Sequence, residues 1–170
     1  MHTVTARFNS SFFFGLTVIG VLAGLNVVSS FFIEQHFQTN LSKVQVNSLY
    51  SNSRYRWDEA NLSFDLEANL TDVYNWNVKL IFAYIEVEYY KPEKHSVVVW
   101  DKIIWRDQDK PVELNLRKEK AKYVMRTKSY DLRNTTATAK LEWIVVPITG
   151  FTYRMSSEPF QFTFPAKYSI

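Results

Sequence analysis

The sequence predicts a mostly antiparallel, all-β domain of the sandwich type, preceded by one N-terminal transmembrane α-helix. Three observations lead to this fold class. Residues 8–33 carry no charge. Most of the segments that follow alternate between apolar and polar residues, as half-buried strands do. No long stretch after residue 33 repeats its apolar residues with the period of a helix. Several short alternating strands joined by turns are typical of a sandwich.

The charge-free run divides the start of the chain into three parts. We expect a short cytosolic N-terminus over residues 1–11, a transmembrane helix over residues 12–33 and a linker over residues 34–40. At about 1.5 Å per residue, roughly 20 residues cross a hydrocarbon core about 30 Å thick. A cleaved signal peptide is the alternative, but its apolar core has only about 7–15 residues. We therefore predict an uncleaved signal anchor.

The charges beside the run predict its orientation. Arg7 precedes it, whereas the first charge after it is Glu34. Because positive charge stays on the cytoplasmic side, we expect a type II protein whose domain, residues 41–170, faces the lumen. The seven-residue linker reaches at most about 25 Å when fully extended. The domain is therefore expected close to the membrane surface.

The alternation predicts the strands of the domain. We expect residues 78–90 to form a central strand, because both faces are apolar at one end. Asp101 and Lys102 interrupt an apolar run, which predicts a bulge or an emerging sheet edge. A short turn of helix, capped by Thr71, is expected over residues 71–76. The other predicted strands lie over residues 61–70, 97–105, 137–146 and 160–164, with further candidates over residues 41–49 and 122–128.

Composition excludes several functions. The chain has 20 Lys and Arg and 17 Asp and Glu, and only Arg7 precedes the apolar run, so 19 and 17 remain and the domain's formal charge is about +2. Nucleic acid is therefore not an expected partner. Residues 117–122 are basic, and we interpret them as a solvated segment. The absence of cysteine excludes disulfides, thiolate nucleophiles and cysteine-based zinc sites.

The residues that most resemble catalytic groups have simpler interpretations. His95 lies in a polar segment between two predicted strands, so we expect it in a surface turn. Ser42 and Lys43 are adjacent on a predicted strand and would point to opposite faces, which prevents a serine–lysine dyad. Asp65, Glu67 and Asn69 share the solvent face of a strand. We predict no catalytic residue, no metal site and no cofactor in this chain.

Sequons and small residues predict two further features. Of the Asn-x-Ser/Thr sequons, Asn134 is the best glycosylation candidate, because it lies in a polar loop with Thr at the third position. Asn61 and Asn69 rank behind it, since both lie in a predicted strand. Gly20 and Gly24 match the small-xxx-small pattern that lets helices approach closely, so they predict a helix-packing face. The nearby Asn26 adds a polar group that needs a neighbour.

Five segments of the domain carry a resemblance to a known family. They are Trp76-Asn77-Val78-Lys79, Val99-Trp100-Asp101-Lys102-Ile103-Ile104, Lys120-Ala121-Lys122-Tyr123, Arg133-Asn134-x-Thr136 and Trp143-Ile144-Val145-Val146-Pro147. In this order, behind one anchor, they resemble the signal peptidase complex subunit 3 family. The resemblance covers nearly the whole chain. Its motif residues are Trp76, Asn77, Lys79, Trp100, Asp101, Lys102, Trp143 and Pro147.

The resemblance implies a non-catalytic subunit of the endoplasmic reticulum enzyme that removes signal peptides. The implied partners are a membrane-anchored serine protease subunit, the other subunits of the complex, nascent secretory chains and the lipid of the endoplasmic reticulum membrane. The domain would be a β scaffold beside the protease, or would help to shape the substrate groove. An independent receptor or tether of the secretory pathway remains the alternative, and a stand-alone hydrolase would require His95 for activity.

Overall fold

The computed structural model describes residues 3–34, 36–106, 111–128 and 131–169. Residues 1–2 of the predicted N-terminus and Gln35 of the predicted linker lie outside the described residues. One helix, α1 (Val4–Ser30), precedes the strands and one short 3-10 turn, η1 (Thr71–Val73). The strands are β1 (Gln38–Asn52), β2 (Trp57–Asn69), β3 (Val78–Tyr90), β4 (Lys94–Trp105), β5 (Glu113–Lys120), β6 (Met125–Lys128), β7 (Thr136–Pro147), β8 (Tyr153–Ser156) and β9 (Phe160–Thr163).

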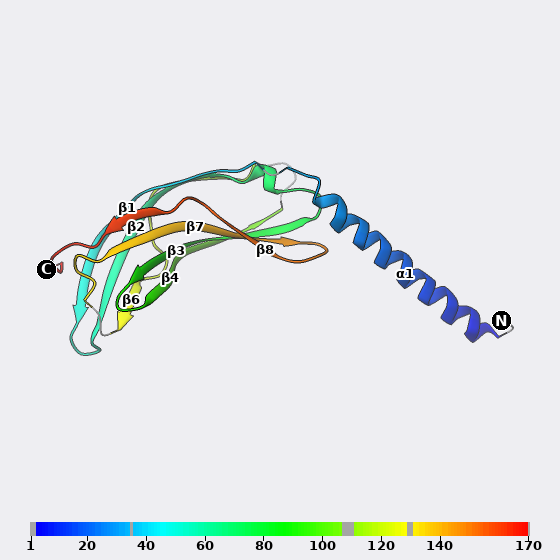
Figure 1. Cartoon of the computed structure of the whole chain (residues 1–170), viewed down its shortest axis with the longest axis horizontal. Coiled ribbons are helices and arrows are strands. Elements are labelled where there is room, and N and C mark those ends of the chain that lie inside the picture. The colour runs from blue at the N-terminus through cyan, green and yellow to red at the C-terminus, as the bar shows by residue number, and fades with distance from the viewer. Residues whose placement is uncertain (1–2, 35, 107–110, 129–130, 170) are drawn as a thin grey trace.

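Helix α1 projects away from the strands as a single long rod (Figure 1). It begins earlier than the predicted span of 12–33, because the Thr3 hydroxyl caps it by accepting a hydrogen bond from the Ala6 N–H. It ends at Ser30, where the hydroxyls of Ser29 and Ser30 donate to carbonyls one turn earlier. Its most apolar window of 18 residues has a mean hydropathy of 2.0 and no buried residue. α1 is thus a candidate membrane-spanning helix.

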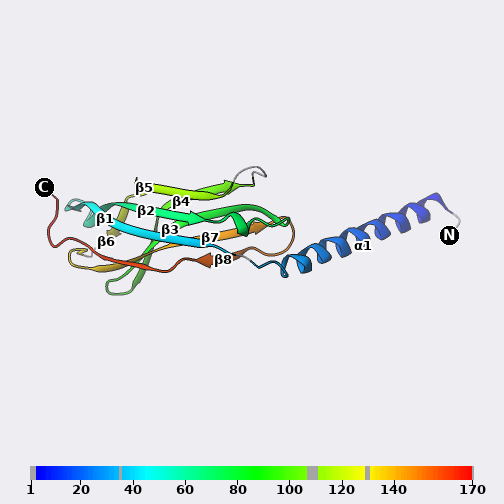
Figure 2. The same ribbon diagram turned by 90° about the horizontal axis from the view of Figure 1, so that it is seen from above.

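The strands form two antiparallel sheets, which confirms the predicted fold class. One sheet has the order β1-β2-β5, with β6 also paired to β2. The other has the order β4-β3-β7-β8, with β9 also paired to β7. The two sheets share one apolar core. The rings of Phe64 on β2 and Trp100 on β4 make contact between the sheets, with 5.9 Å between their centroids. Figures 1 and 2 show the long, curved strands side by side.

The alternating segments lie as the sequence predicts. Strand β2 buries its apolar face, including Phe64 and Leu66, and β3 is central because it pairs with both β4 and β7. Strand β4 pairs only with β3 among the described residues, so it is the expected edge. The bulge lies earlier than Asp101, because the extra residue opposite β3 is Val99. The inward residues of β7 are Ala139, Leu141, Trp143 and Val145.

The basic residues of the segment 117–122 are exposed, as expected of a solvated segment, and residues 117–120 form the end of β5. Two expectations were wrong in detail. Thr71 does not cap η1; its hydroxyl accepts a hydrogen bond from the Val112 N–H instead. His95 is part of β4, where its ring stacks on Tyr89 at 5.2 Å, so it is not a turn residue.

Candidate functional site

The place where α1 meets the sandwich is a compact polar junction inside apolar surroundings. Asn26, the only amide between Asn9 and the end of α1, donates its side-chain N–H groups to Asn77 Oδ1 at 3.0 Å and to Thr149 Oγ1 at 2.9 Å. A polar side chain within a membrane helix is costly unless it finds a partner. The sandwich supplies that partner, so the two parts of the molecule are tied through the helix's own polar group.

Asn77 is the centre of this junction and is only 4% exposed. Its side-chain oxygen accepts from the Thr149 N–H at 3.0 Å, and its side-chain nitrogen donates to the Thr149 carbonyl at 2.8 Å. Its own carbonyl accepts from the Ile148 N–H at 2.6 Å. Asn77 therefore fixes the turn between β7 and β8 while it holds Asn26. The turn can lie against the helix because its backbone groups already have partners.

Gly150 lets the turn approach the helix. Its φ of 104° lies in the region that side chains rarely adopt, and a Cβ there would lie 3.2 Å from a methyl group of Val27. Both facts require glycine at this position. On the other side of the junction, Trp76 donates its indole N–H to Ser29 Oγ at 3.2 Å, while its carbonyl accepts from Arg106 at 3.0 Å.

A cavity of about 340 Å³ lies between the end of α1 and the β7–β8 turn. Its lining is mainly apolar and includes no charged residue. Such a space suits an apolar group and offers no acid–base pair for chemistry. The lining residues are Val27, Ser30, Phe31, Ile33, Asn75, Asn77, Pro147, Thr149, Gly150, Phe151, Thr152 and Tyr153.

The structure brings only some of the motif residues together. Trp76, Asn77 and Pro147 meet at the junction. Lys79 is exposed near the start of β3, and Trp143 is fully buried in the core. The sequence indicated that Asn26 needs a polar neighbour, but its pairing with Asn77 across the fold was not visible there.

The motif residues on β4 form a separate latch. The Asp101 carboxylate accepts from the Tyr123 hydroxyl at 2.9 Å and pairs with Lys122 at 3.3 Å. Lys122 also lies 5.7 Å above the ring of the buried Trp100. These contacts hold the segment between β5 and β6 against β4, so they close one side of the sandwich. Lys102, the next residue on β4, is exposed.

An ion-pair cluster lies on the outer face of β3 and β7. Lys140 contacts Glu86 at 3.3 Å, Glu88 at 2.8 Å and Glu142 at 2.8 Å. Burial raises the pKa of Glu142, but hydrogen bonds from Lys140 and Tyr84 outweigh it, so the pKa is lowered. Burial and the bond to Glu142 raise the pKa of Tyr84 to about 12. Lys140 and Tyr84 donate hydrogen bonds to Glu142, which explains how this buried carboxylate stays charged.

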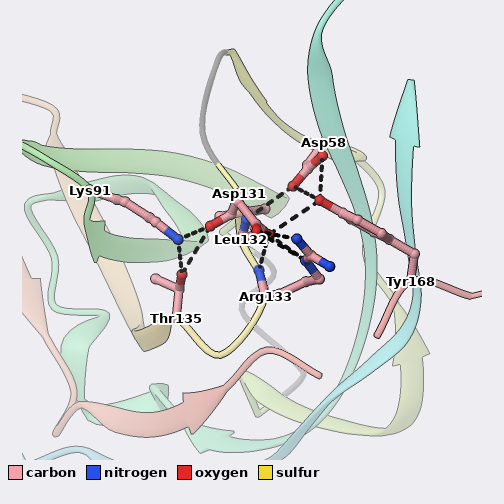
Figure 3. Close-up of polar contacts among 7 residues, drawn as sticks. All are labelled: Asp58, Lys91, Asp131, Leu132, Arg133, Thr135 and Tyr168. Carbon is pink, nitrogen blue, oxygen red and sulfur yellow. Dashed lines mark hydrogen bonds and ion pairs between the residues drawn. The ribbon is translucent and has the colours of Figure 1, made fainter. Parts of the chain in front are cut away.

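A second polar cluster closes the end of the sandwich opposite to α1 (Figure 3). Buried Asp58 accepts from the Leu132 N–H at 3.0 Å and from the Tyr168 hydroxyl at 3.0 Å. Arg133 donates to Asp131 at 2.9 and 2.6 Å and holds the pKa of that carboxyl well below its ordinary value. The ion pair of Arg133 with Asp131 therefore contributes to folding stability at neutral pH. This contribution is lost only as the pH falls through the lowered pKa of Asp131. The cluster ties the C-terminal segment to β2.

The remaining candidate residues have structural partners. Lys43 pairs with Asp65 at 3.2 Å, and Asp65 also accepts from the Lys118 N–H at 2.8 Å. Glu67 pairs with Arg117 at 3.2 Å. The Asn69 side chain accepts from the Thr71 N–H at 3.0 Å. Asp65, Glu67 and Asn69, which share the solvent face of β2, are thus engaged in ion pairs and a turn.

The sequons and the glycine pair differ in their surroundings. Asn134 is exposed in the loop before β7, with a φ of 53°. Asn61 is half-buried on β2 and donates to Ser48 Oγ at 2.9 Å. A methyl group at Gly20 or Gly24 would meet nothing within 4 Å. This open face leaves their helix packing a prediction.

Comparison with known proteins gives a consistent result. Residues 1–167 match the family described as signal peptidase subunit. The chain is 32% identical to signal peptidase complex subunit 3 of Drosophila melanogaster over 99% of this chain and 98% of the relative. It is 30% identical to the Dictyostelium discoideum protein of the same name, over 99% and 97%. The Homo sapiens protein of that name is 33% identical, over 88% and 86%.

We expect Asn77→Ala to destabilise the junction, because the Thr149 N–H and the Asn26 amide lose a buried acceptor. The free energy of unfolding should fall by about 1–3 kcal/mol. Thermal unfolding of the full chain in lipid nanodiscs, followed by circular dichroism, measures the change. Asn115→Ala, at an exposed position on β5, is the matched control and should change stability by less than about 0.5 kcal/mol. Equal effects of the two changes would contradict the role of Asn77.

Proposed function

This chain belongs to the signal peptidase complex subunit 3 family, and from that membership we propose that it serves the complex as a non-catalytic scaffold for the protease subunit. It is anchored once in the endoplasmic reticulum membrane, with its N-terminus in the cytosol and its sandwich in the lumen. There it stands beside the site where signal peptides emerge from the bilayer and are cut. The observation that carries the proposal is the junction of Asn26, Asn77 and Thr149.

A scaffold must hold a fixed position relative to the membrane, and the junction supports that requirement. The polar contacts of Asn77 and the close approach of Gly150 to Val27 restrict rotation of the sandwich about the end of α1. A flexible linker alone would leave the domain free to swing. The fixed junction places the domain's sheet edges at a defined height above the bilayer.

The edge strand β4 is the surface we propose for the protease subunit. Among the described residues β4 pairs with another strand on one side only, so no strand covers its other edge. The carbonyls of Val99 and Ile104 already accept hydrogen bonds from the Tyr123 N–H at 3.0 Å and the Tyr74 hydroxyl at 2.5 Å. Ile103 and Trp105 lie on its outer face and are 51% and 62% exposed. Exposed apolar residues beside an open edge favour a protein contact over plain solvation. A partner strand or an extended nascent chain fits such an edge.

The exposed loop of Asn134 supports a luminal position for the sandwich. Both Asn134 and Thr136, the two specified positions of the sequon, are exposed. The loop lies at the end of the sandwich far from α1, where a bulky glycan meets neither the membrane nor the strands (Figure 1). Asn61, by contrast, lies within a paired strand.

Purification of the complex in a mild detergent tests the scaffold role. The tagged chain should recover the protease subunit, whereas Ile103→Ser combined with Trp105→Ser should lose most of it, because the apolar contact on β4 is removed. Tyr50→Ser, an exposed aromatic position on β1, is the control and should recover the protease normally. Expression of this chain without the protease subunit should yield no signal-peptide cleavage. Recovery of the chain alone would support the tether, and cleavage by the chain alone would refute a non-catalytic role.

Glycosylation tests the luminal orientation. We expect one glycan at Asn134 that endoglycosidase H removes, seen as a mobility shift on a gel. Asn134→Gln should abolish the shift, because the sequon in the exposed loop before β7 is lost. Asn61→Gln should leave it unchanged, since that side chain lies in a paired strand. A glycan that persists in Asn134→Gln and disappears in Asn61→Gln would reverse our assignment.

A further inference from the structure

The turn between β7 and β8, residues 148–152, lies beside the last turn of α1, N-terminal to the point where the helix ends. Thr149 contacts Asn26 at 2.9 Å, and Gly150 packs on Val27. Asn26 precedes the last helical residue, Ser30, by one turn, which at 1.5 Å per residue is about 6 Å along the axis. Figure 1 shows the turn reaching back beside the base of the helix. If α1 crosses the bilayer, this turn lies at the depth of the helix's final turn.

The residues of the turn suit that depth. The chain carries no charge between Glu142 and Arg154. Ile148 is 59% and Phe151 92% exposed. Large apolar side chains with that exposure are unfavourable in water and favourable in the acyl region of a membrane.

Large aromatic side chains also lie around the C-terminal end of α1. Phe31 and Phe32 follow the helix and are exposed, and Trp76 reaches Ser29 from the sandwich. Aromatic residues, Trp above all, are enriched where a membrane meets water. We call Phe31, Phe32, Trp76, Ile148 and Phe151 the apolar collar.

The backbone hydrogen bonding of the turn also suits an environment with little water. An unpaired N–H or carbonyl is costly away from water. Asn77 accepts from the N–H groups of Ile148 and Thr149 and donates to the Thr149 carbonyl. The first half of the turn is thus paired within the protein before it meets lipid.

We propose that the β7–β8 turn inserts into the luminal leaflet and that the apolar collar is a lipid-binding surface. Acyl chains cover Ile148 and Phe151 and fill the cavity between the turn and α1. The sandwich then has two attachments to the bilayer, the helix and the turn. The occupant is lipid because the collar is continuous with the exposed surface of α1. The proposal goes beyond the scaffold role and rests on α1 crossing the bilayer.

Depth measurement by spin labelling tests the insertion, and the absence of cysteine makes single labels simple. The full chain with Phe151→Cys is labelled with a nitroxide and placed in lipid nanodiscs. Oxygen concentrates in lipid, whereas a water-soluble nickel chelate does not enter it. We expect the Phe151 label to collide more with oxygen than with nickel. Phe14→Cys in the middle of α1 is the lipid control, and Ser53→Cys in the distant β1–β2 turn is the aqueous control.

Three results would overturn the proposal. A Phe151 label as accessible to nickel as the Ser53 label would place the turn in water. Exclusion of both reagents would mean that protein, such as a second copy, covers the collar. A water-exposed Phe14 label would show that α1 does not cross the bilayer, and this outcome separates a wrong topology from a wrong depth. Ile148→Cys provides an independent label in the same turn, and circular dichroism verifies that each variant folds.

Discussion

The pairing of Asn26 is the constraint on which the rest of this structure depends. One amide stands among apolar residues in the second half of α1 and cannot be left without a partner in a membrane. Asn77 and Thr149 provide that partner from the sandwich. Once this contact forms, the β7–β8 turn passes beside Val27, and the close approach and positive φ at position 150 favour glycine there. Helix α1 and the sandwich therefore behave as one unit.

The sandwich has no disulfides, and apolar contacts in its interior together with polar contacts at its periphery hold it rigid. A single core joins both sheets, and the ring of the exposed Phe37, just before β1, packs at 5.0 Å on Trp143, which is part of that core. Hydrogen bonds and ion pairs then close the periphery: the contacts of Asp101 on one side and the Asp58 cluster at the end far from α1. The proposed scaffold role needs this arrangement, because mobile ends would not hold the edge strands in a fixed position.

Strands β2 and β3 were predictable because apolar and polar residues alternate along them, as they do in any half-buried strand. Strand β5 escaped prediction because the charges of residues 117–120 mask the pattern of Leu114 and Leu116. The junction was only half visible: Asn26 stood out as a lone amide, but its partners are 51 and 123 residues away. Contacts of that kind depend on how the two sheets pack, which local pattern does not encode. Likewise, only the structure distinguished the exposed loop position of Asn134 from the half-buried, strand-paired position of Asn61.

Oxidative cross-linking of Asn26→Cys with Thr149→Cys tests most directly whether α1 and the sandwich are one unit. A disulfide needs Cα atoms within about 7 Å of each other, a range that two side chains sharing a hydrogen bond reach with small movements of the backbone. The full chain in native membranes should form the bond upon mild oxidation, detected as a linked peptide pair by mass spectrometry. Phe14→Cys with Thr149→Cys, three turns further from the junction, should not form it. Absence of the Asn26–Thr149 link, or equal linking in the two pairs, would contradict the fixed junction.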